Sequence, residues 1–322
     1  MTICIDAWEA LRGDPLPWLL DQRRPNLHSK VLLELVGRPP ESPAVVRARR
    51  GSNSVEPVAS LIDDLNPDGS RAVDAALWRM YSGMGWRLLA AIQWGADPAD
   101  PRLQAAAEGL LESAPGEGGF ARREGGSAVP WLTARVLHGL AELGLCRHPR
   151  FQEGLAWLED GDAKHPDGGW WGEGRRSVTG ECNVTAVALL GALKACADLP
   201  RPVLQRRAVD SVLRTIAAAS GSRVRLGHPV LNRTDEAELL WALARVGAPL
   251  EPAMVCALKR LQERQLDGGR WRRDVAVPTS LPVAIESAPG DPSRWVTLKC
   301  VVALMRYAVE GKLPRMYPQK PS

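Results

Sequence analysis

A glycine-rich turn recurs along the chain at intervals of 50 residues, and this repetition constrains the fold more than any other feature. Gly69, Gly119 and Gly169 are 50 residues apart, and Gly269 follows after a further 100. The missing copy falls near residue 219, where Ser220-Gly221-Ser222 supplies a degenerate turn. A chain of 322 residues with such a period is expected to form one large domain of similar, stacked units.

Two helical patterns alternate between these turns, and each predicts a different environment. One is apolar on nearly all sides, which predicts burial, at 27–37, 85–95, 130–144, 181–197, 233–247 and 294–309. The other is more polar and begins at a proline, a residue that the first helical turn tolerates, at 43–50, 101–112, 149–159, 202–218 and 252–265.

The alternation predicts an all-α fold with an inner and an outer helical layer. We expect an α/α toroid (an α6/α6 barrel) of about six helix hairpins around a central cavity. An open solenoid of the same hairpins is the alternative. Residues 1–322 are expected to form a single domain, with the repeats over roughly 27–310 and a tail at 311–322.

Composition and charge argue against several classes of function. The 41 basic and 37 acidic residues give a net charge of +4, without a basic run interleaved with aromatic residues, so nucleic-acid binding is not predicted. Apolar stretches are too short for a membrane span, and the first residues lack the pattern of a signal peptide. Six scattered cysteines without a CxxC pair indicate reduced thiols, and hence a cytoplasmic protein whose oligomeric state the sequence does not indicate.

The segment Gln265-Leu-Asp-Gly-Gly-Arg-Trp271 and the Asp-Gly-Gly-Trp turn at 167–170 carry a family resemblance. They resemble the turns of the prenyltransferase and squalene oxidase repeat superfamily, which includes class II terpene cyclases and the β-subunits of protein prenyltransferases. Segments that begin at Pro43, Pro149 and Ser293 are similar to those of uncharacterised bacterial single-domain members. The resemblance covers roughly 27–310 and implies a toroid whose cavity holds a hydrophobic, isoprenoid or polyene-like small molecule.

The same resemblance implies candidate catalytic residues. Class II cyclases protonate their substrate with the central Asp of an Asp-x-Asp-Asp-Thr-Ala motif, which is similar to 181–186 here, with Asn183 at the position of the proton donor. An amide cannot supply that proton, so Glu181 and Asp235 become the candidate acids, and Asn183 and Arg233 become orienting groups. Helix capping is the alternative interpretation of Glu181, Asn183 and Asp235.

Further substrate-binding residues are expected around the same cavity. Glu236 and Arg294 lie near the starts of predicted inner helices, whose N-termini in a toroid would surround one mouth of the cavity and favour an anionic group. Trp86, Trp131 and Trp295 are expected to form an apolar wall able to stabilise a carbocation. Packing between the helical layers is the alternative role of these tryptophans.

The working hypothesis is a terpene-cyclase-like enzyme that cyclises or isomerises its substrate by acid/base chemistry, without a metal or another cofactor. One alternative is a zinc-dependent prenyltransferase-like enzyme with Cys182, His228 and Asp235 as ligands. Another is a toroid without catalytic activity that binds a ligand or serves as a scaffold.

Overall fold

A computed structural model describes residues 11–63, 65, 77–79, 81, 83–112, 118–123, 125–160, 170, 183–218, 225–231, 233–277, 281 and 287–308. Over these ranges the regular secondary structure is helical, and β-type pairing occurs only as isolated bridges. The predicted all-α class is therefore confirmed. Within the same ranges, no helix combines the length and the hydrophobicity needed to cross a bilayer.

The inner and outer helices occur where the sequence predicts them. The inner helices are α3 (Pro25–Glu34), α6 (Met84–Gln93), α8 (Pro130–Glu142), α10 (Asn183–Ala195), α12 (Glu236–Arg245) and α14 (Arg294–Ala308). The outer helices are α4 (Pro43–Ser52), α7 (Pro101–Glu112), α9 (Pro149–Asp160), α11 (Pro202–Ala218) and α13 (Pro252–Glu263). Two shorter helices, α2 (Leu16–Leu19) and α5 (Val58–Asp63), complete the described set.

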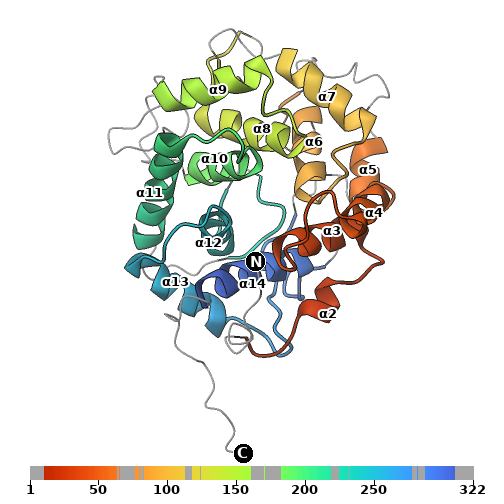
Figure 1. Ribbon diagram of the computed structural model, residues 1–322, viewed down its shortest axis with the longest axis vertical. Helices are drawn as coiled ribbons and strands as arrows, with labels where there is room; N and C mark the ends of the chain where they lie inside the picture. The colour runs from red at the N-terminus through yellow and green to blue at the C-terminus, as the bar shows by residue number, and fades with distance from the viewer. Residues whose placement is uncertain are drawn as a thin grey trace, which may run out of the picture.

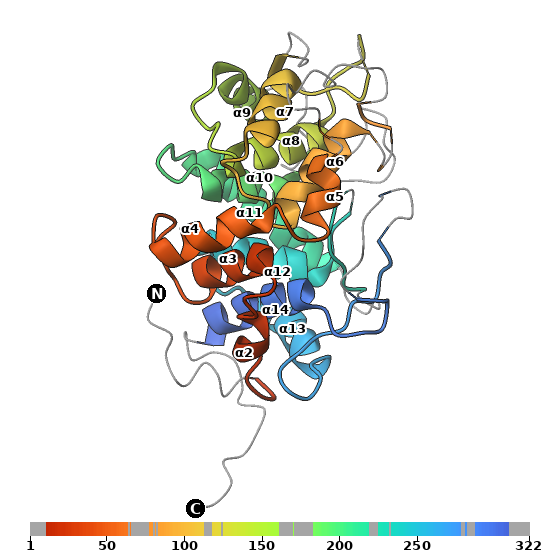
Figure 2. The same ribbon diagram turned by 90° about the vertical axis from the view of Figure 1, so that its right-hand side faces the viewer.

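Contacts between helices follow the order of the repeats. Each inner helix from α3 to α12 contacts the outer helix that follows it, and α6, α8, α10, α12 and α14 contact one another in sequence (Figure 1). α14 also contacts α3, while the Asn26 side chain of α3 donates a hydrogen bond to the Trp94 carbonyl at the end of α6, at 3.0 Å. Figure 2 shows the same arrangement from the side, with α3 and α4 side by side.

The burial pattern explains why the two layers form. Ten consecutive residues of α10, from Val184 to Leu193, are buried, as expected for a helix covered on all sides. In α11, by contrast, the buried positions recur three or four residues apart, from Leu204 to Ile216, so one face packs inward and the other meets solvent.

Two of the recurring turns end at a tryptophan whose indole is hydrogen-bonded to the outer helix that precedes the turn. The indole N–H of Trp271 donates to the Leu261 carbonyl in α13 at 2.7 Å, and that of Trp170 donates to the Leu158 carbonyl in α9 at 2.9 Å. Both indoles are fully buried. Gly268 has a φ of +73°, which a residue with a side chain rarely adopts. The turn motif therefore has a structural function that the repeat reuses.

A disulfide differs from the sequence-based expectation of reduced thiols. Cys146, just after α8, is bonded to Cys196, just after α10. The two residues are 50 positions apart, which is one repeat, so equivalent points of neighbouring hairpins come together. The spacing of the cysteines along the chain does not indicate that these two lie close together. Cys256 and Cys300 are free thiols.

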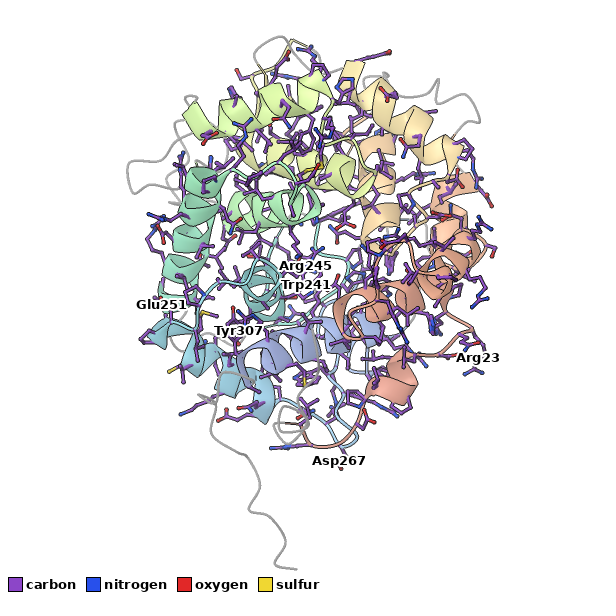
Figure 3. All side chains as sticks on the ribbon, viewed as in Figure 1. Arg23, Trp241, Arg245, Glu251, Asp267 and Tyr307 are labelled. Carbon is purple, nitrogen blue, oxygen red and sulfur yellow. A yellow bond between two sulfur atoms is a disulfide. The ribbon has the colours of Figure 1, made fainter. Side chains whose placement is uncertain are left out.

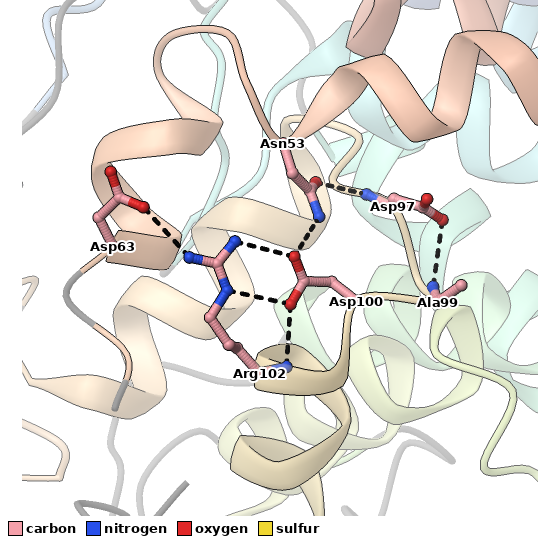
Figure 4. A network of polar contacts seen from close by, with 6 residues as sticks. All are labelled: Asn53, Asp63, Asp97, Ala99, Asp100 and Arg102. Atoms are coloured by element: carbon pink, nitrogen blue, oxygen red, sulfur yellow. Dashed lines mark hydrogen bonds and ion pairs between the residues drawn. The ribbon is translucent and has the colours of Figure 1, made fainter. Parts of the chain in front are cut away.

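A polar network connects the first hairpin to the second (Figure 4). The Asp100 carboxylate accepts hydrogen bonds from the Arg102 guanidinium, at 3.0 and 3.2 Å, and from the Asn53 amide at 2.8 Å. Arg102 also contacts Asp63 at the end of α5, at 3.1 Å. Burial would raise the pKa of Asp100, but the hydrogen bonds from Arg102 and Asn53 outweigh it and lower that pKa. The network therefore requires an ionised carboxylate.

Candidate functional site

A pocket of about 650 Å³, open solvent at its mouth included, lies between the inner helices. Its lining comes from α3, α6, α8, α12 and α14, together with the loop at 225–231. The lining positions on one helix are three or four residues apart, so a single face of each helix meets the pocket. The apolar part of the wall consists of Leu89, Ile92, Gly139, Trp241, Trp295 and Leu298.

A buried ion pair lies on one side of the pocket. The Lys299 ammonium of α14 contacts the Glu238 carboxylate of α12, and the two side chains are only 5% and 4% exposed. Burial would raise the pKa of Glu238, but the positive charges of Lys299 and Arg135 outweigh it and lower that pKa. Glu238 is therefore an ionised partner of Lys299, which makes it a poor proton donor.

A second group of charges surrounds Glu142 near the C-terminus of α8. Its carboxylate contacts the Lys30 ammonium at 2.7 Å and the Arg245 guanidinium at 3.1 Å. Burial would raise the pKa of Glu142, yet Lys30, His138 and Arg245 together hold it well below its usual value. Glu142, like Glu238, is therefore held in its ionised form.

Trp241 connects this second group to the pocket wall. Its indole N–H donates to the Glu34 carboxylate of α3 at 2.7 Å, and the Arg245 guanidinium lies over its ring, 4.6 Å from the centroid. Figure 3 shows Trp241 and Arg245 on the side of α12 that faces the interior of the molecule. The indole is thus fixed at both its polar edge and its ring surface.

The loop that carries His228 is held in place from several sides. The N–H of Leu226 donates to the Asp274 carboxylate and that of Gly227 to the Asp235 carboxylate, both at 2.7 Å. Beyond His228, the Gln93 amide of α6 accepts the Val230 N–H at 2.9 Å and donates to the Val230 carbonyl at 3.1 Å. These two hydrogen bonds join residues that are 137 positions apart in the sequence.

The imidazole of His228 is packed between aromatic rings but lacks hydrogen bonds. It stacks on Trp295 with the ring centroids 4.6 Å apart and the planes 8° apart, and it meets Trp94 edge-on at 5.7 Å. The residue is 6% exposed, and within the described part of the chain neither ring nitrogen has a hydrogen-bond partner. Because buried polar groups are normally paired, two orphan nitrogens beside a pocket make His228 a candidate for contact with a ligand.

The charge state of His228 follows from its surroundings. Burial and the positive charges of Lys299 and Arg273 lower its pKa well below the usual value. The ring is therefore neutral around pH 7, with one nitrogen able to accept a proton and the other able to donate a hydrogen bond. The neutral form is the one that a general base needs, and the same lowered pKa makes this imidazole a weaker proton acceptor than a free one.

Asp235, a predicted catalytic acid, is the N-cap of α12. Its carboxylate accepts the Glu238 N–H at 2.8 Å and the Gly227 N–H at 2.7 Å. Burial, with a contribution from the charge of Glu238 and against that of Lys299, raises the pKa of Asp235 to about 6. Asp235 is not part of the pocket lining. Asp235 therefore caps α12, as the alternative interpretation predicts. It also positions the loop that carries His228, so its role in the site is indirect.

Three predicted binding residues near helix starts are not part of the pocket lining. The Glu236 carboxylate contacts the Arg260 guanidinium of α13. Arg294 donates to the Trp18 carbonyl at 3.2 Å, and its guanidinium lies over that indole. The Arg233 side chain is exposed. These three are therefore outside the pocket lining, as is Asn183, the first residue of α10.

The three predicted wall tryptophans divide into two groups. Trp295 lines the pocket and carries His228 on its face. Trp86 and Trp131 stack on each other at 5.9 Å within the hydrophobic core, in accord with the packing alternative, and they are not part of this pocket's lining. Glu181 and Cys182 lie outside the described residues.

Of the three alternative zinc ligands, His228 and Asp235 lie in the described part of the chain and Cys182 lies outside it. Both carboxylate oxygens of Asp235 already accept backbone N–H groups. A search of the described residues finds no group of three His, Cys, Asp or Glu side chains arranged to hold a metal ion.

Sequence reasoning missed most of the polar pocket lining. Lys30, Glu34, Glu142 and Glu238 are charged residues inside otherwise apolar inner helices, and that contrast is a usable signal. The spacing of positions 135, 138 and 142 on α8 places Arg135, His138 and Glu142 on one helical face.

No protein-family model matches the chain, and a search of curated proteins finds no significant match to it. The resemblance to the prenyltransferase and squalene oxidase repeat superfamily therefore stays a prediction from the turn motifs, such as the one that ends at Trp271.

Proposed function

We propose that this chain is an enzyme that isomerises or cyclises a hydrophobic small molecule in the pocket between its inner helices, by acid/base chemistry that needs no metal. The observation that carries the proposal is His228, a buried neutral imidazole whose two nitrogens have no partner among the described residues and which lines that pocket.

The proposal includes the architecture. We propose that the hairpins close into an α/α toroid of the prenyltransferase and squalene oxidase repeat type. The contact between α14 and α3 supports closure, because an open solenoid would leave its first and last inner helices apart. Lining residues from α3, α6, α8, α12 and α14 support a pocket at the centre of such a ring.

The pocket suits a small, largely apolar ligand. The volume of about 650 Å³ includes open solvent at the mouth, so the enclosed part of the pocket has room for a small molecule only. Leucine, isoleucine and tryptophan side chains would contact the apolar body of an isoprenoid or polyene-like ligand, and the few polar groups would orient its functional group.

Each polar residue has a separate role in this proposal. His228 transfers the proton, while Asp235 and Gln93 fix the loop on which it lies. Lys299 and Glu238 supply fixed charge beside the reacting group. Glu181 is retained as a second candidate acid from its position in the sequence alone.

Product analysis tests the catalytic part of the proposal. Farnesol, farnesal and β-ionone are incubated with the wild type, with His228→Gln and with the control His148→Gln, whose half-buried imidazole lies away from the pocket. We expect the wild type and the control to convert at least one compound, and the His228 variant to be slower by a factor on the order of 100. Equal conversion by all three proteins would refute the role of His228.

A pocket-filling variant tests the location of the site. Leu298 is 2% exposed and lines the pocket, so Leu298→Trp should occupy the space that a ligand needs. We expect β-ionone to raise the melting temperature of the wild type but not that of a folded Leu298→Trp protein. The same rise in both proteins would place the binding site elsewhere.

A further inference from the structure

The aromatic surface of the pocket is already in contact with positive charge from the protein. The Arg245 guanidinium lies 4.6 Å from the Trp241 ring centroid, and the Lys299 ammonium lies 5.6 Å from it. Trp295, the other tryptophan of the wall, stacks on His228. A cationic intermediate would therefore have to compete with two protein cations for the indole of Trp241.

The fixed charges of the wall are balanced in number, so their positions decide which charge they stabilise. Lys30, Arg135 and Lys299 are opposed by Glu34, Glu142 and Glu238 on the lining, and the Arg245 guanidinium lies over the Trp241 ring. The carboxylates of Glu142 and Glu238 are in ion pairs with these cations. Because charges interact strongly where water is excluded, negative charge that develops next to the Lys299 ammonium would be stabilised, whereas a substrate cation at the same place would be repelled.

Lys299 is the group best placed to stabilise that charge. Its ammonium has three N–H donors, and the hydrogen bond to Glu238 uses one of them. It lies one helical turn after Trp295, the residue on which His228 stacks, so the base and the cation line the same part of the pocket.

We infer that the substrate is an apolar compound with an enolisable carbonyl group, that His228 removes the proton next to the carbonyl, and that the Lys299 ammonium stabilises the resulting oxyanion. This inference rests on the proposed function and names its substrate class.

The reaction balances without a further reagent. The proton leaves carbon for the free imidazole nitrogen, the electron pair of the broken C–H bond forms a carbon–carbon double bond, and the carbonyl π pair moves to oxygen. In a β,γ-unsaturated substrate the enolate is a dienolate, and the imidazolium, paired with that anion, then returns the proton to its γ-carbon. The carbonyl is restored, His228 is neutral again, and a double bond in the substrate has changed place.

Hydrogen exchange tests the chemistry with a defined probe. 2-Tetralone is an apolar bicyclic ketone with acidic C–H groups beside its carbonyl, and its exchange in D₂O is followed by proton NMR. We expect the wild type and the His148→Gln control to accelerate exchange, and His228→Gln to lose that acceleration by a factor on the order of 100. Exchange that is equally fast with His228→Gln, or no faster with the wild type than in buffer, would overturn the inference.

Binding to the wild type tests the sign of the charge and needs no variant. 2-Naphthol places a weakly acidic phenolic oxygen where the enolate of 2-tetralone has its oxyanion, whereas trimethyl(2-naphthyl)ammonium presents a positive charge on the same ring system. We expect calorimetry to show at least tenfold tighter binding of the naphthol. Tighter binding of the ammonium compound would overturn the inference but leave the pocket as a ligand site, whereas binding of neither compound would overturn both the inference and the proposed function.

Discussion

Replacement of Lys299 by methionine should show how strongly the stability of the folded protein depends on the buried charges of the pocket. The substitution keeps the apolar stem but removes the ammonium that contacts Glu238, and both side chains are at most 5% exposed. Loss of one partner from a buried ion pair leaves an uncompensated charge and costs about 3–5 kcal/mol. A protein of 322 residues has an unfolding entropy of about 0.7 kcal/mol per degree, so the melting temperature should fall by about 4–7 °C.

The loss of stability caused by Lys299→Met should grow as pH rises. In the wild type the pKa of Glu238 is lowered, so the stability that this group contributes is present above its unfolded pKa and is lost as pH falls through the lower folded value. Without Lys299, burial would raise the pKa of Glu238 instead, and the group would have to take up a proton on folding. The free-energy cost of this proton uptake falls by about 1.4 kcal/mol for each pH unit, as the pH is lowered toward the raised pKa of Glu238.

Thermal unfolding followed by circular dichroism at pH 5.5 and pH 8 provides the assay. The deficit of Lys299→Met should be larger at pH 8, and the double variant Lys299→Met, Glu238→Gln should recover much of it, since no unpaired charge remains. Arg147→Met removes one partner of the Arg147–Asp198 pair, whose side chains are 73% and 60% exposed, and should shift the melting temperature by less than about 2 °C. An equal deficit at both pH values, or one no larger than that of Arg147→Met, would refute the reasoning.

Four further predictions follow from single contacts. A Cβ at position 191 would collide with the His138 imidazole, so Gly191→Ala should cost about 1–3 kcal/mol by chemical denaturation, and His138→Ala should restore part of the loss. Since the folded pKa of Asp235 is raised from 3.8 to about 6, its contribution to stability should be lost as pH rises between those values, and Asp235→Asn should abolish that pH dependence of the melting temperature. Reduction of the Cys146–Cys196 disulfide, which spans 50 positions, should destabilise the wild type by about 4 kcal/mol, whereas a variant with both cysteines replaced by serine should not respond to reductant. Dialysis against a chelator should leave the melting temperature unchanged, because both Asp235 oxygens are occupied by backbone N–H groups, and a fall reversed by zinc would contradict this.

Much of the helical fold was predictable because its signals are local. A proline in the first helical turn marks the start of every outer helix, at Pro43, Pro101, Pro149, Pro202 and Pro252. The apolar inner segments also agree with the helices to within a few residues; for example, 130–144 contains α8 at Pro130–Glu142. The Cys146–Cys196 contact was missed because it needs three-dimensional register between neighbouring repeats.

The site was harder to predict because capping and pocket residues look alike in sequence. Asp235 and Glu236 begin an inner helix, and their carboxylates contact backbone N–H groups and Arg260. The pocket is lined further along the same helix, at Glu238 and Trp241. A helix that is apolar on nearly all sides does not reveal which face meets the centre, and only its few charged residues mark that face.

His228 shows the limit of sequence reasoning most clearly. Its loop is positioned by Gln93, which is distant in sequence, and its ring is positioned by Trp94 and Trp295. No local pattern indicates that both imidazole nitrogens would be buried without a partner among the described residues.

The most direct test of the account is a crystal structure of the protein with 6-bromo-2-naphthol, in which anomalous scattering locates the bromine without ambiguity. The account predicts one bound molecule between α3, α6, α8, α12 and α14, with its oxygen within hydrogen-bond distance of the Lys299 ammonium and its ring carbons beside the His228 imidazole. Bromine on the outer surface alone, or a pocket closed by protein side chains, would contradict it.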